Sequence, residues 1–154
     1  MKNVPLALSV GGLAIVWTYA AITLGLPAWA GFVSWAFFFV AGGDGKAIMK
    51  AWVPLMAGVF FGYVSLYGGT PIGISVAVGV SAAILVLLTA IPAFALAPAA
   101  FGAFAVFFAY AFGFSNNNPF DFNNVVQVVI ALTCGVAVGY VSTALPAMFA
   151  GSKA

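Results

Sequence analysis

Residues 58–65 read GVFFGYVS, and residues 135–142 read GVAVGYVS. The second stretch begins 77 residues after the first, half the length of the 154-residue chain, and six of the eight positions are identical. Glycine pairs arise easily in a glycine-rich chain, but the shared Tyr-Val-Ser favours duplication of one unit. In an apolar helix, glycines four residues apart lie on one face and let a neighbouring backbone approach closely. The predicted helix-packing positions are Gly58, Gly62, Gly135 and Gly139.

A second similarity lies upstream of each copy. Residues 27–42 align with residues 98–113 at an offset of 71, with Pro, Ala, Gly, Phe and Gly in common. The offset then grows by six, which predicts an insertion at residues 115–120 in the second half. After that insertion the only two carboxylates of the chain, Asp44 and Asp121, align with each other. We interpret the chain as two copies of one unit.

The composition indicates a membrane protein. Hydrophobic residues make up 66% of the chain and charged residues 4%, and the ionisable side chains other than Tyr and Cys are four Lys and two Asp. A soluble domain carries about 25% charged residues on its surface, so we predict a polytopic protein with the lipid bilayer as its solvent. Cys134 stands alone in an apolar run, and we interpret it as a packing residue.

The same composition disfavours several functions. Without His, Glu or Arg there is no material for a Ser-His-Asp triad, a zinc site or an arginine clamp on phosphate. We therefore expect no enzyme activity, no cofactor and no metal site. A net charge of +2 with scattered lysines gives no basis for nucleic-acid binding.

Six membrane-spanning helices follow from the usual length of about 20 apolar residues per crossing. The first begins after Lys2 and is long enough to span, so we interpret it as a helix rather than a cleaved signal peptide. We predict one membrane domain over residues 1–154, with repeat one at about 4–67 and repeat two at about 72–148. The predicted helices are residues 4–24, 28–42, 47–67, 72–91, 96–113 and 124–148.

The lysines predict the orientation. Lys2 precedes the first helix, Lys46 and Lys50 follow the second, and Lys153 follows the last, so six spans place all four on one face. The positive-inside rule makes that face cytoplasmic, with both termini inside. Three helices per unit is an odd number, so the second copy enters the membrane from the opposite side, which is the inverted-repeat plan of channels and transporters. The Asn-rich loop at 115–124 then lies outside, either as a lid or as a cap on helix ends.

A few side chains are candidates for a function. Asp44 and Asp121 each stand just before the third helix of a repeat, where a helix cap is the favoured interpretation. A phenylalanine stripe on a helix is more often packing than a pore, but paired rings can narrow an uncharged pore. Ser and Thr in hydrocarbon usually bond a carbonyl of the preceding turn. The pore-constriction candidates are Phe37, Phe108, Ser65 and Ser142.

The stretch LGLPAWAGF at residues 24–32, with Trp17 before it and Gly42-Gly43 after it, resembles the YcdZ-like bacterial inner-membrane proteins, a family of unknown function. The resemblance implies a bacterial inner-membrane location and brings no substrate or active site. The Trp-Ala-Gly-Phe helix followed by a Lys-bearing helix is also similar, more weakly, to the membrane half of aromatic-acid exporters, a family with a cytoplasmic partner domain that this chain does not have.

Two functions of different classes stay open at this point. The first is a passive channel or facilitator for a small, mostly neutral solute, in a homo-oligomer. No ionisable residue is predicted in the middle of a span, as proton- and ion-coupled carriers require, and this favours passive conduction. The second is a non-conducting structural or accessory subunit that docks other membrane subunits.

Overall fold

A computed structural model describes residues 4–115 and 118–151, which form helices and no strand. Lys2 and Lys153, on which the predicted orientation partly rests, lie outside the described residues. The elements are α1 (Val4–Leu24), α2 (Ala28–Val40), α3 (Ala47–Ile72), α4 (Ile74–Leu88), the short 3₁₀ helix η1 (Pro92–Phe94), α5 (Ala97–Gly113) and α6 (Phe122–Gly151).

Three of the helices are long and apolar enough to cross a membrane, namely α1, α3 and α6. The other three are apolar but shorter, with 13 residues in α2, 15 in α4 and 17 in α5. At about 1.5 Å per residue these reach roughly 20 to 26 Å, less than the hydrocarbon thickness of about 30 Å. These apolar helices are compatible with a multi-pass membrane protein, although only three of the six α-helices have full spanning length.

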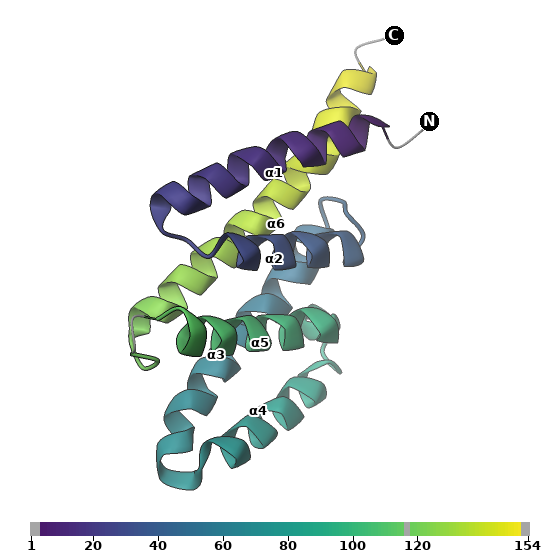
Figure 1. Ribbon diagram of the computed structural model, residues 1–154. Helices are drawn as coiled ribbons and strands as arrows, with labels where there is room; N and C mark the ends of the chain where they lie inside the picture. The colour runs from purple at the N-terminus through teal and green to yellow at the C-terminus, as the bar shows by residue number, and fades with distance from the viewer. Residues whose placement is uncertain (1–3, 116–117, 152–154) are drawn as a thin grey trace.

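Two long helices organise the molecule. In Figure 1, α3 and α6 run along its length, and α1, α2, α5 and α4 lie across them in that order from top to bottom. The helices α4 and α5 pack mainly on α3, while α1 and α2 pack mainly on α6. Each long helix therefore carries helices from the other half of the chain: α5 of the second half lies on α3, and α1 and α2 of the first half lie on α6.

The predicted break at residues 68–71 lies inside α3, so that prediction is wrong. The helix continues past these residues, and the chain turns at Gly73, whose φ of 88° lies in the left-handed region. Pro71 has no N–H for the Tyr67 carbonyl oxygen. The Thr70 hydroxyl donates a hydrogen bond to that oxygen at 2.8 Å instead, so the carbonyl keeps a partner and the last turn of the helix is retained.

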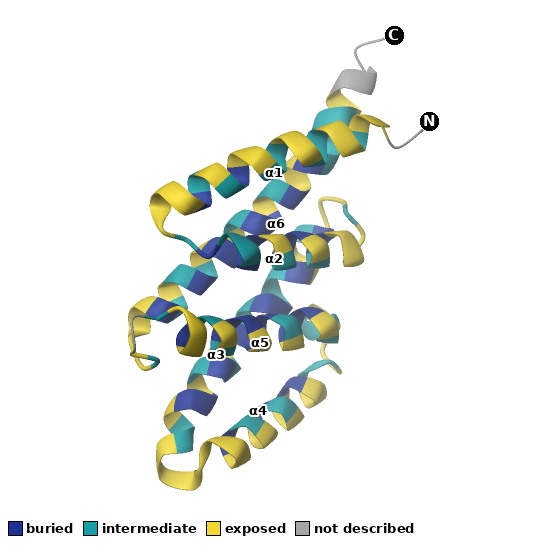
Figure 2. Cartoon of the chain, viewed as in Figure 1, coloured by how far each residue is buried: buried dark blue, intermediate teal, exposed yellow. Residues whose placement is uncertain are grey.

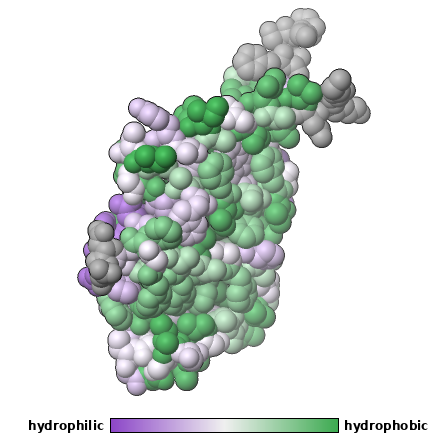
Figure 3. All heavy atoms as spheres, viewed as in Figure 1, coloured by the Kyte–Doolittle hydropathy of each residue, from purple (hydrophilic) through white to green (hydrophobic). Residues whose placement is uncertain are grey.

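Much of the surface is apolar. Buried residues lie where α3 crosses α5 and where α6 crosses α2, whereas α1 is mostly exposed (Figure 2). Its outer face carries Leu8, Ile15, Tyr19 and Ile22, each more than 70% exposed. Figure 3 shows hydrophobic atoms over most of the visible face. An apolar surface of this extent is typical of a protein that contacts lipid.

Candidate functional site

The first glycine pair lies where α3 crosses α5. A Cβ atom added at Gly58 would overlap the Ala100 carbonyl oxygen and lie 2.9 Å from the Ala103 Cβ atom. A Cβ added at Gly62 would lie 2.7 Å from Cδ1 of Phe107. Both separations are too short for real atoms, so the two helices approach this closely only because these residues have no side chain.

The second glycine pair makes the same contact between α6 and α2. A Cβ at Gly135 would overlap the carbonyl oxygen of Gly31 and Oγ of Ser34, and a Cβ at Gly139 would lie 2.9 Å from Cδ1 of Phe38. The helices α3 and α6 therefore each pack through a glycine pair on a helix from the other half of the chain, α3 on α5 and α6 on α2.

The contacts of the two glycine pairs give a different sequence alignment of α2 with α5 from the one predicted. The residues that contact equivalent glycines are 69 positions apart in the sequence, as are the first residues of the two helices, Ala28 and Ala97. The offset of 71 came from aligning Pro27 with Pro98. Pro27 precedes the first residue of α2, whereas Pro98 is the second residue of α5, so the alignment of the two prolines is two residues too long. The equivalent pairs are Gly31 with Ala100, Ser34 with Ala103, Phe38 with Phe107, and Phe39 with Phe108.

The offset of 77 between α3 and α6 agrees with burial along both helices. Most buried positions of α3 have buried partners in α6 at that spacing, the exceptions being Ala57 and Leu66, and the pattern repeats every three or four residues on one face of each helix. The matched buried pairs are Ala51 with Val128, Leu55 with Leu132, Val59 with Val136, and Ser65 with Ser142.

The candidate rings Phe37 and Phe108 are not brought together by the described aromatic contacts. The ring of Phe37 lies against Gly102 of α5, where an added Cβ would overlap it. The ring of Phe108 stacks on that of Phe112, with centroids 6.0 Å apart and planes 4° apart. Contacts to Phe104 and Phe107 complete an aromatic cluster on α5. The two candidates therefore have different surroundings.

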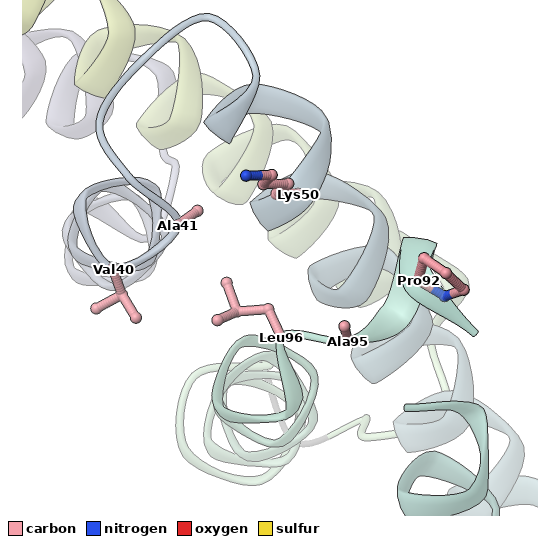
Figure 4. Close-up of a pocket in the computed structure, with 6 residues that line it drawn as sticks. All are labelled: Val40, Ala41, Lys50, Pro92, Ala95 and Leu96. Atoms are coloured by element: carbon pink, nitrogen blue, oxygen red, sulfur yellow. The ribbon is translucent and has the colours of Figure 1, made fainter. Parts of the chain in front are cut away.

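Figure 4 shows a pocket between the two halves of the chain. It has a volume of about 250 Å³ and is lined by the end of α2, the first turn of α3, and the segment from η1 to the start of α5. Lys50 supplies its only charged side chain, and Val40, Ala41 and Leu96 form much of the apolar wall. Phe37 is not a lining residue, but it lies one turn before Val40 and Ala41 on the same face of α2.

The candidate serines are buried and hydrogen-bonded. Ser65 Oγ donates to the Phe61 carbonyl oxygen at 2.7 Å, and Ser142 Oγ donates to the Gly139 carbonyl oxygen at 2.6 Å. Ser142 also accepts a hydrogen bond from Nε1 of Trp35 at 3.2 Å. The sequence analysis missed this link between α2 and α6. A buried indole N–H needs a hydrogen-bond partner, and this requirement of Trp35 could have indicated a contact with one of the few polar side chains.

The two aspartates lie at helix N-termini. Asp44 Oδ1 accepts a hydrogen bond from the backbone N–H of Ala47 at 2.8 Å, at the first residue of α3. Asp121 Oδ1 accepts one from the N–H of Asn123 at 2.9 Å, in the first turn of α6. Both carboxylates satisfy N–H groups that have no partner within their helix.

A family profile described as "Protein of unknown function (DUF1097)" matches residues 7–147. The chain belongs to the DUF1097 family. No curated protein and no solved structure matches it. The match places the chain in an uncharacterised family, as the sequence predicted, while the narrower likeness to YcdZ-like proteins stays a prediction. Membership of the DUF1097 family covers all six helices and assigns no activity to any of the residues above.

Proposed function

We propose that the chain is a six-span protein of a bacterial inner membrane, built as two inverted three-helix repeats with both termini in the cytoplasm. Support comes from the paired crossings, in which α3 packs on α5 as α6 packs on α2. The lysines add support, because Lys46 and Lys50 lie together at the start of α3. A reporter enzyme that is active only in the periplasm, fused after residue 154, should stay inactive, and strong activity would contradict this topology.

Within that architecture, we propose a passive facilitator for a small, mostly neutral solute. One observation carries the proposal: the pocket at Lys50 is lined by residues of both halves of the chain. Phe37, one turn before the pocket residues of α2, lies against Gly102 of α5. Because α2 and α5 are equivalent helices, their contact lies near the axis that relates the repeats, where inverted-repeat proteins place their path. The apolar wall of the pocket and the Phe37 ring between α2 and α5 favour neutral solutes over ions, which need replacement of their hydration shell.

A non-conducting structural or accessory subunit is the second candidate. Large side chains fill the interior between the long helices, and Phe38, Phe107, Leu55 and Leu132 are each essentially fully buried. A close-packed interior of this kind suits a module that docks other membrane subunits or further copies of itself. The facilitator proposal requires that this packing opens during transport, and the subunit proposal does not.

Stopped-flow light scattering on liposomes tests the two candidates. Vesicles with the protein should pass small neutral solutes faster than empty vesicles, while ion conductance should stay near background. Phe37→Ala removes the ring that lies between α2 and Gly102 of α5 and should speed the passage of larger solutes. Phe108→Ala tests the second candidate ring, and Phe60→Ala is the matched control because Phe60 is 58% exposed on the outer face of α3.

Equal rates in empty and protein-containing vesicles for every solute would contradict the facilitator and favour the subunit. If Phe37→Ala and Phe60→Ala have the same rates as the parent although the parent conducts, the path does not run past Phe37.

A further inference from the structure

The pocket at Lys50 has the composition of a site for a small anion with an apolar body. Figure 4 shows the Lys50 amino group directed from α3 toward Ala41 at the end of α2. The volume of about 250 Å³ is below the roughly 300 to 1,000 Å³ of pockets for drug-sized ligands, so the occupant is small. Apart from Lys50, the lining is apolar and consists of Val40, Ala41, Pro92, Ala95 and Leu96.

None of the described residues that line the pocket is an anion that could pair with Lys50. The chain has two carboxylates, Asp44 and Asp121, and both accept hydrogen bonds at helix N-termini outside the pocket. The helix α2 ends at the pocket and α5 begins there, so the negative end of one helix dipole offsets the positive end of the other. The charge of Lys50 therefore decides which ligands the pocket attracts.

The equivalent place in the other half of the chain has aromatic rings and no cation. At the 69-residue offset Ala41 corresponds to Tyr110, near the end of α5. The ring of Tyr110 stacks on Phe114, and Phe114 contacts Trp29 at the start of α2, with ring centroids 6.3 Å and 5.8 Å apart. At the 77-residue offset Lys50 corresponds to the neutral Gln127. An alanine at the position of a tyrosine and a lysine at the position of a glutamine thus distinguish the end with the pocket.

We propose that this pocket binds a short-chain monocarboxylate, with the carboxylate at the Lys50 amino group and the alkyl chain on Val40 and Leu96. One cation matches one negative charge. A dianion such as a phosphate ester would keep a second charge without a partner beside apolar walls, which is costly. The alkyl chain gains from leaving water for the apolar wall.

Binding at this site does not depend on whether the protein transports a solute. One consequence does rest on the proposed function: because the pocket lies on the proposed path, a bound carboxylate should slow the passage of neutral solutes.

A ligand-detected NMR titration tests the site. The protein is reconstituted in nanodiscs of phosphatidylcholine, hexanoate is the probe, and the signal of empty nanodiscs is subtracted. The parent should bind hexanoate saturably, and it should bind the neutral hexanamide about fivefold more weakly, the effect of one ion pair at an exposed lysine. Lys50→Met should bind the two probes equally. Lys50→Arg, which keeps the charge, should retain the preference for hexanoate.

A second variant tests the cavity rather than the charge. Ala41→Tyr supplies the ring that Tyr110 places at the equivalent position, and it should abolish binding of both probes. Ala41 has a φ of −71° and a ψ of −10°, a backbone conformation that accepts a larger side chain. Were this variant to misfold, Lys50→Met still decides, because Lys50 is exposed.

The liposome assay separates this site from the proposed function. Hexanoate should slow the passage of neutral solutes through the parent but not through Lys50→Met. Saturable binding to the parent without any effect on its solute passage would support the site and contradict the path.

Four outcomes would overturn the proposal. The first is that the parent gives the same signal as empty nanodiscs. The second is that the parent binds hexanoate and hexanamide equally, and the third is that Lys50→Met keeps the preference for hexanoate. The fourth is that replacing half of the phosphatidylcholine with phosphatidylglycerol abolishes binding of the uncharged hexanamide, which would assign the pocket to a lipid headgroup.

Discussion

Gly62 and Gly139 occupy equivalent places in the two repeats, yet each contacts a different helix. Gly62 lies on Phe107 of α5, and Gly139 lies on Phe38 of α2. These two phenylalanines are themselves equivalent and fully buried. A glycine under a buried ring fixes the distance between two backbones, because a larger residue would displace a ring that has no free space to enter.

Leucine at either glycine should therefore destabilise the protein. Gly62→Leu and Gly139→Leu each force a large side chain against a buried ring, and overpacking of this kind costs about 1 to 3 kcal/mol. Gly11→Leu is the matched control, because a Cβ at Gly11 would meet nothing within 4 Å. Thermal unfolding of the purified proteins in one detergent measures the effect. Identical melting temperatures for all three variants and the parent would show that the glycines do not set the approach of the helices.

At the scale of single residues, sequence reasoning succeeds where one residue type has one dominant physical use. Glycines four apart in an apolar helix and aspartates just before a helix are of this kind, and the contacts of Gly58 and Asp44 follow from their position in the chain. Phenylalanine has no such single use. Phe37 is half-buried, whereas Phe39, two residues later, is exposed, so an alignment error of two residues pairs rings in different surroundings.

Among the helices, the junction of α3 with α4 depends on one residue. Gly73 has a φ of 88° and ends α3, while Ala77 at the start of α4 donates its N–H to the Gly73 carbonyl oxygen at 3.1 Å. Gly69, one turn earlier, has Ile74 so near that an added Cβ would lie 2.9 Å from its Cα. The turn between α3 and α4 thus needs glycine at residue 73 for its positive φ and at residue 69 for the close approach of Ile74.

A side chain at Gly73 should weaken this junction. Gly73→Val imposes a β-branched residue on a left-handed φ, which costs of the order of 1 to 3 kcal/mol. Gly79→Ala, within α4 and open to its surroundings, should instead be neutral or stabilising by up to about 1 kcal/mol. Chemical denaturation in detergent measures both. A Gly73→Val protein as stable as the parent would mean that the junction relaxes without cost.

The helices themselves were largely predictable, and their ends were less so. The apolar runs and their glycine and proline breaks predicted six helices in the observed order, and α1 has the predicted bounds. The end of α3 was missed because the break was assigned to the residues 68–71, where Thr70 compensates for Pro71. Glycine and proline residues indicate where a helix can end. They do not show whether a nearby hydroxyl will bond the carbonyl oxygen that proline leaves without an N–H partner.

At the scale of the whole molecule, the main packing joins the two repeats. The closest contacts are those of α3 with α5 and of α6 with α2, so each half of the chain provides the partner of the other. The likeness of the two halves was visible in the sequence, but this exchange of packing partners was not. A repeat in the sequence indicates which helices are alike but not which helices pack together. Several packing arrangements of these helices would bury the same glycine faces.

This exchange predicts that the two halves depend on each other as separate chains. Residues 1–72 and 73–154, expressed together with an affinity tag on one, should co-purify as a complex, because each supplies the helix on which the glycines of the other pack. Each half expressed alone should be poorly retained in the membrane or should aggregate, since its glycine face has no partner. Gly62→Leu in the first half or Gly139→Leu in the second should reduce the yield of the complex, and Gly11→Leu should leave it unchanged. Should each half purify alone as a stable species that does not bind the other, the packing between repeats would not be what holds the molecule together.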